Sequence, residues 1–137
     1  MGHRTGGVAD EIFTLDEIAE LFKFKSRRLR EIVSGLDGIR IASPPLQSLT
    51  NTLAFTVAGT DSVVLLAGLD LEGICASSGS ACSAGSLEPS HLIAALGFGD
   101  ELARSLVRFS LGRTSTLDEV EYVGRVLPEV IARARQR

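Results

Sequence analysis

The clearest structural signal in this chain is the stretch 106–119, which reads Leu106-Val107-Arg108-Phe109-Ser110-Leu111-Gly112-Arg113-Thr114-Ser115-Thr116-Leu117-Asp118-Glu119. Apolar and polar residues alternate over 106–111, which predicts a strand with one buried face. Thr116 and Glu119 have the spacing of a capping box, so a helix is expected to begin at Leu117. Apolar residues then recur along one face of this helix: Val120, Val123, Val126, Leu127, Val130 and Ile131. The stretch therefore predicts a strand followed by an amphipathic helix that can cover it.

The rest of the chain contains similar elements on both sides of this unit. Thr14-Leu15-Asp16-Glu17 is a second capping box, and the helical period after it predicts one long helix or two abutting helices over about 15–34, ended by Gly35. Further expected elements are strands at 39–41 and 51–57, a helix over 63–69 capped by Asp61, a buried strand at 73–76, and short helices from about 89 to 96 and from 100. Short strands interspersed with helices predict an α+β fold, a two-layer sandwich of a small, mainly antiparallel sheet with helices.

Composition and charge exclude several classes of protein. The chain has 137 residues, 45% of them hydrophobic and 23% charged, which suits one folded domain and argues against disorder. No apolar run reaches the roughly 18 residues of a membrane helix, and the first residues lack the apolar segment of a signal peptide, so a cytoplasmic location is expected. Residues 14–30 have some features of a helix-turn-helix, but the turn lacks its usual glycine and the net charge is −3, so no nucleic-acid partner is expected.

Cys82 is the candidate nucleophile of the chain. It lies in the run 77–86, which holds five serines, two glycines and nothing larger than cysteine, and is therefore expected to be a loop. A thiol on such a loop is unshielded and can move toward a reacting centre. The only other cysteine, Cys75, is expected to be buried in its apolar strand. Seven residues apart, the two form neither a redox C-x-x-C motif nor part of a zinc site, and no metal site is expected.

Arg108 is the second residue that could carry chemistry. Within an apolar strand it either faces solvent on the outer side of the sheet or directs its guanidinium at a carboxylate, and the spacing alone favours neither. Arg113, just after the strand, is expected to be a surface or loop-anchoring residue. His91, near a helix start, is expected to be a solvated or capping residue.

Two motifs resemble the cysteine desulfurases of the iron–sulfur-cluster-assembly type, which are members of the class V aminotransferase family. Residues 77–91 resemble the active-site cysteine loop of these enzymes, and residues 107–113 resemble a second motif at matching separation. Residues 51–55 and 116–135 resemble the strand and the terminal helix of their small domain. The resemblance implies the fold of the small domain of fold-type I pyridoxal-phosphate enzymes. Residues 35–137 would be this small domain, and residues 1–34 an N-terminal helical segment that is a remnant of the large domain or a link to it.

The resemblance also implies roles for particular residues. Cys82 would be the mobile cysteine that accepts sulfur from L-cysteine as a persulfide, and Arg108 would bind the substrate carboxylate. The family holds pyridoxal phosphate on a lysine of its large domain, and Lys23 and Lys25, the only lysines here, do not match that position. The cofactor-binding residues of this chain are therefore unknown, and the chain alone is not expected to hold the cofactor covalently. Implied partners are a large cofactor-binding domain or chain, a sulfur acceptor or scaffold protein and, for the complete enzyme, a second copy.

Three interpretations of the isolated chain stay open. It is a piece of a desulfurase, a small subunit that completes a site with a separate cofactor-binding chain, or a stand-alone persulfide carrier or scaffold-binding module without enzyme activity. An exposed apolar face would favour the first two, and a closed charged surface would favour the third. The sulfur acceptor, and the choice between cysteine and selenocysteine as substrate, cannot be predicted.

Overall fold

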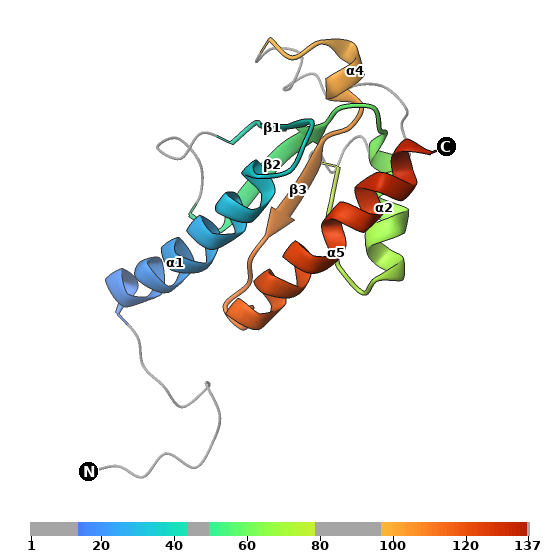
Figure 1. Cartoon of the computed structure of the whole chain (residues 1–137). Helices are drawn as coiled ribbons and strands as arrows, with labels where there is room; N and C mark the ends of the chain where they lie inside the picture. Colours follow the sequence, from blue (N-terminus) through green and yellow to red (C-terminus); the bar gives the residue numbers. More distant parts are fainter. Residues whose placement is uncertain (1–13, 44–49, 79–96, 137) are drawn as a thin grey trace, which may run out of the picture.

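A computed structural model describes residues 14–43, 50–78 and 97–136 of the chain (Figure 1). Its elements, in chain order, are α1 (Leu15–Ser34), β1 (Ile39–Ile41), β2 (Thr52–Val57), α2 (Ser62–Leu71), α4 (Asp100–Ala103), β3 (Val107–Ser110) and α5 (Leu117–Arg135). The strand and helix expected from residues 106–119 are thus present as β3 and α5. Within the described residues, no helix is both long and apolar enough to cross a bilayer.

The three strands form one antiparallel sheet in the order β1-β2-β3. Ile39 of β1 lies opposite Val57 of β2, while Leu53 of β2 lies opposite Phe109 of β3. Alternation along the strands therefore sends one set of apolar side chains to a single face. That set is fully or almost fully buried: Leu53, Phe55, Val57, Val107 and Phe109.

Helices α1, α5 and α2 cover this apolar face and form the second layer (Figure 1). Leu29 and Val33 of α1 and Leu65 and Leu69 of α2 enter the same core as the strands. α5 lies between the other two helices and contributes a buried stripe: Val120, Leu127, Val130 and Ile131. The prediction of an α+β two-layer sandwich with an antiparallel sheet is confirmed.

The two long helices begin where their capping boxes predict. The hydroxyl of Thr14 accepts from the amide of Glu17, and that of Thr116 accepts from the amide of Glu119, while each glutamate accepts from the amide of its threonine at 2.8 Å. α1 is one continuous helix from Leu15 to Ser34, so it contains no helix-turn-helix. Asp61 caps α2, which runs over 62–71 and is longer than the 63–69 expected.

The opposite face of the sheet, called here the second face, is more polar. It carries Arg40, Ala54, Thr56 and Arg108, which alternate with the buried apolar set. A small apolar cluster that includes Phe98 and residues of α4 packs against Ala54 at one end of this face. The guanidinium of Arg40 lies 4.2 Å from the centre of the Phe98 ring.

One expected strand and its cysteine differ from the prediction. Residues 73–76 form no strand, and only Ser77 pairs with the sheet, as an isolated bridge to Arg108. Cys75 is exposed, so the expectation that it is a buried apolar residue is wrong. The reason is alternation: Ile74 takes the core position, so that Cys75 next to it points outward.

An ion pair between α1 and α5 predicts a pH dependence of stability. The Arg28 guanidinium donates to both carboxylate oxygens of Glu121, and this interaction holds the pKa of Glu121 below its ordinary value of 4.5. A carboxyl whose pKa is lowered by folding stabilises the fold above its unfolded pKa, and this contribution is lost as the pH falls through the folded pKa. We expect Glu121→Gln to lower the free energy of unfolding in urea at neutral pH, and the deficit to shrink below about pH 4.5. Glu129→Gln, on an exposed position of the same helix, is the control; a deficit that is equal at all pH values would contradict this origin.

Candidate functional site

Arg108 is held in the middle of β3, with its side chain on the second face. Its neighbours in the strand, Val107 and Phe109, are buried on the helix side. Ala54 of β2 lies directly opposite Arg108, and Ser77 lies opposite it on the other edge of β3. Directly opposed residues of antiparallel strands project to the same side, so a small residue flanks Arg108 on each side. This arrangement leaves room for the half-buried arginine between two short side chains.

The backbone of Ser77 is tied to that of Arg108 in both directions. The amide of Ser77 donates to the carbonyl of Arg108 at 3.0 Å, and the amide of Arg108 donates to the carbonyl of Ser77 at 2.7 Å. These bonds fix the backbone of Ser77 beside Arg108. The described part of this segment ends one residue later, at Ser78. Cys82 and His91 follow in the segment 79–96, which lies outside the described residues, so the predictions for both stay predictions.

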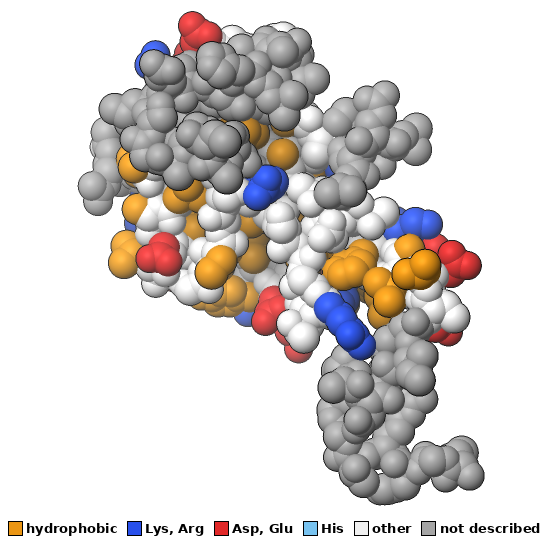
Figure 2. Space-filling model, turned by 180° about the vertical axis from the view of Figure 1, so that it is seen from behind, with side chains coloured by type: hydrophobic (Ala, Val, Ile, Leu, Met, Phe, Trp, Pro, Cys, Tyr) orange, Lys and Arg blue, Asp and Glu red, His pale blue; other side chains and the backbone are white. Residues whose placement is uncertain are grey.

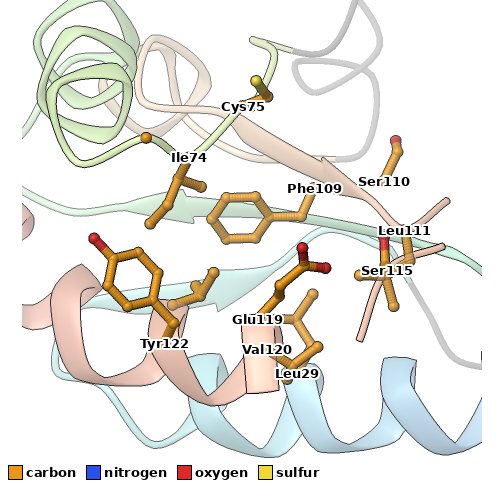
Figure 3. A pocket seen from close by; sticks show the side chains of 12 residues that line it. Leu29, Ile74, Cys75, Phe109, Ser110, Leu111, Ser115, Glu119, Val120 and Tyr122 are labelled. Atoms are coloured by element: carbon orange, nitrogen blue, oxygen red, sulfur yellow. The ribbon is translucent and has the colours of Figure 1, made fainter. Parts of the chain in front are cut away.

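Cys75 occupies the same side of its segment as Ser77, two residues away. It borders a cleft of about 300 Å³ between α1, α5 and the end of β3. Figure 3 shows the Phe109 ring inside this cleft, near Ile74 and Tyr122, while the thiol of Cys75 points away from it. The hydroxyl of Tyr122 donates to the carbonyl of Glu72 at 2.8 Å and so ties α5 to the segment that enters the cleft. Among the described residues, the walls of this cleft are mainly apolar.

The two lysines have surface roles on α1. Lys23 pairs with Glu20 at 3.0 Å, and Lys25 donates to the carbonyl of Ser115 in the turn before α5. Neither lines the cleft beside Cys75. Within the described part of the chain, no group of three or more metal-ligating side chains is present. The described residues thus do not fit a covalently held pyridoxal phosphate.

Two other arginines, Arg30 and Arg113, have surroundings that differ from those of Arg108. Arg30 donates to the carbonyl of Ser43 at 2.8 Å, and its partial burial lowers the pKa of its guanidinium. Arg113 is exposed after β3, as expected. Of the sequence-predicted site residues, only Arg108 is described, and the structure places it at the sheet surface beside the segment that leads to Cys82.

Ser77 lies directly beside Arg108, and the sequence does not single it out. Its place in the serine-rich run 77–86 predicts a loop, whereas the structure pairs it with Arg108 of the sheet. Its hydroxyl oxygen is buried and has no hydrogen-bond partner among the described residues. The apolar run Ile74-Cys75-Ala76 just before it was the only available signal of an extended segment, and it does not reveal which strand Ser77 pairs with.

Comparisons with known proteins agree with this architecture. Residues 9–123 match the family model "Aminotransferase class-V". The chain is 34% identical over 123 residues to cysteine desulfurase IscS of Clostridium botulinum, and 35% identical over 132 residues to that of Dictyoglomus turgidum. These matches cover 88% and 94% of this chain but only 31% and 34% of the relatives, so the chain spans about a third of their length. A solved NifS-like protein from Rickettsia africae superimposes with a TM-score of 0.71 at 29% identity, covering 83% of this chain and 29% of that one. This chain therefore belongs to the class-V aminotransferase family.

Proposed function

We propose that this chain is the small, C-terminal domain of a cysteine desulfurase and that it carries the sulfur-accepting Cys82. The observation that carries the proposal is the bridge between Ser77 and Arg108. It anchors the segment containing the thiol beside the guanidinium that would hold the substrate. In this proposal, residues 35–137 are the small domain and residues 1–34 link it to a large domain.

The length of chain between Ser77 and Cys82 supports this pairing. Cys82 comes five residues after Ser77, and an extended chain spans at most about 3.6 Å per residue, so the two Cα atoms are at most about 18 Å apart. A thiol on this tether can reach a substrate bound at Arg108 and can also reach an acceptor outside the site. The small residues around Cys82 offer little steric hindrance to such motion.

The chemistry assigned to the chain is a sulfur transfer. Arg108 would bind the carboxylate of L-cysteine through two parallel N–H···O bonds. The Cys82 thiolate would form an S–S bond with the substrate sulfur, while the C–S bond breaks and its electron pair stays on the substrate carbon. Protonation of that carbon gives alanine and leaves a persulfide on Cys82. Pyridoxal phosphate, bound by the large domain, would supply the electron sink.

The exposed apolar side chains support the interpretation that this chain normally packs against another domain or protein. Leu15 and Phe24 of α1 are 86% and 60% exposed, and Figure 2 shows hydrophobic side chains gathered at this end of the molecule. Leu71, at the end of α2, is 83% exposed. Apolar surface of this kind is typical of an interface. It supports association with a large cofactor-binding domain or chain, within an enzyme that dimerises and passes sulfur to an acceptor or scaffold protein, over a stand-alone persulfide carrier.

The test compares the isolated chain with a chimera, in which residues 14–137 replace the corresponding segment of a complete cysteine desulfurase. With L-cysteine, pyridoxal phosphate and a thiol, we expect no alanine from the isolated chain and turnover from the chimera. Mass spectrometry should find one added sulfur atom on Cys82. Cys82→Ala should abolish turnover, whereas Cys75→Ala, which removes the other thiol, should preserve it. Turnover that survives in Cys82→Ala and is lost in Cys75→Ala would contradict the assignment, and turnover by the isolated chain would contradict the need for a large domain.

A further inference from the structure

We propose that the Ser77 hydroxyl is a second carboxylate-binding group, which donates to the same carboxylate as Arg108. This inference rests on the proposed function, since it extends the substrate site assigned to Arg108. In this inference Ser77 joins Arg108 in binding the carboxylate, and both groups belong to this chain.

The first support is the register of the second face. Ser77 and Arg108 form a directly opposed, doubly hydrogen-bonded pair, with N···O distances of 2.7 and 3.0 Å. In such a pair the Cβ atoms lie about 5 Å apart and project to the same side of the sheet. The two side chains therefore leave the sheet side by side, and the backbone bonds fix this relation.

The second support is the hydroxyl itself. Both backbone polar groups of Ser77 are used in the bridge, so the side-chain oxygen is the only polar group of this residue without a partner among the described residues. Buried hydroxyls are usually hydrogen-bonded, and an exception calls for a physical reason. A carboxylate held by Arg108 would supply the missing acceptor. Rotation about χ1 moves the oxygen between staggered positions without any movement of the backbone.

The third support is the lack of a competing polar side chain at the position opposite Arg108 on β2. Ala54, opposite Arg108 on β2, is the smallest residue that still has a side chain, and it adds no polar group that could compete for the guanidinium. The other arginine on this face, Arg40, stacks on Phe98. Arg108 and Ser77 are thus a cation and a hydroxyl at opposed positions on the same face of the sheet.

The experiment is an NMR titration of the full chain with L-alanine, followed at the backbone amides of Ser77 and Arg108 and at the Arg108 Nε–H. L-alaninamide, which lacks the carboxylate, is the ligand control. We expect L-alanine but not the amide to shift these signals. Ser77→Ala should raise the Kd for L-alanine about tenfold, as for the loss of one hydrogen bond to a charged group. Ser77→Thr, which keeps the hydroxyl, should bind within about twofold of the parent. Ser78→Ala, on the next residue and the other side of the chain, should not change the Kd.

Each other outcome overturns a stated part of the argument. If Ser77→Ala binds like the parent while Arg108→Ala does not bind, the role of Ser77 is wrong and that of Arg108 stands. If the parent does not bind L-alanine, this chain does not contain a complete carboxylate site and the inference fails, while the chimera still tests the sulfur transfer. If Arg108→Ala binds as tightly as the parent, both the inference and the proposed role of Arg108 fail. The chemical shifts of Leu53 and Phe109 verify in every variant that the sheet is intact.

Discussion

Phe55→Ala is expected to lower the free energy of unfolding by about 3–5 kcal/mol, the largest effect on stability that we expect from a single substitution in this chain. Phe55 is completely buried in the central strand β2, and its ring centre lies 5.4 Å from that of Phe109. Removal of the ring loses buried apolar area and leaves a cavity that the three helices above it cannot fill. Since domains of this size are stable by only about 5–15 kcal/mol, a large share of the total would be lost.

Urea denaturation followed by circular dichroism measures this loss, and Phe24→Ala is its matched control. The same side chain is removed there from α1, where it is 60% exposed, so the expected change is within about 0.5 kcal/mol. Equal losses for the two variants would show that the layer between the sheet and α5 is not the core of the fold.

Arg108→Ala is expected to reduce kcat/KM for L-cysteine by at least about 150-fold in the chimera that carries residues 14–137. A charge-assisted hydrogen bond contributes about 1.5–3 kcal/mol, and the proposed fork to the carboxylate contains two of them. If the carboxylate is bound equally well in the ground state and the transition state, the loss falls mainly on KM. Steady-state alanine formation over a range of L-cysteine concentrations separates KM from kcat.

Arg113→Ala is the control for this measurement, because it removes the same charge from an exposed position five residues away. Its kcat/KM should stay within about twofold of the parent. A similar loss in both variants would point to the overall charge of this region, and an unchanged kcat/KM in Arg108→Ala would remove Arg108 from the proposed site.

The elements that depend on local sequence could be predicted. Both capping boxes, at Thr14 and Thr116, act within four residues, and each begins its helix where the spacing indicates. The alternation around Phe109 likewise assigned the two sides of β3. Local signals of this kind also identified Arg108 as the one cation in the strand. They did not show which face of the sheet its side chain occupies, because this depends on which face the helices cover.

The partner of Ser77 could not be predicted, because it depends on two segments about thirty residues apart in the chain. The exposure of Cys75 was not predicted either. Its apolar neighbours suggest burial, yet Ile74 and, in part, Ala76 pack against the core while Cys75 is exposed. The arrangement around Arg108 is therefore a property of the assembled sheet, while the assignment of Cys82 rests on the composition of its loop and stays a prediction.

Because both lysines lie on α1, amine-reactive reagents are expected to modify this helix selectively. Apart from an α-amino group at the start of the chain, Lys23 and Lys25 are the only primary amines, and the Lys25 ammonium is engaged by the Ser115 carbonyl. An amine-directed fluorophore or cross-linker would therefore attach to the protruding helix, at Lys23 first. The face that carries Arg108 has no such amine, so an attached probe can report on docking at α1 while the proposed substrate site stays unlabelled.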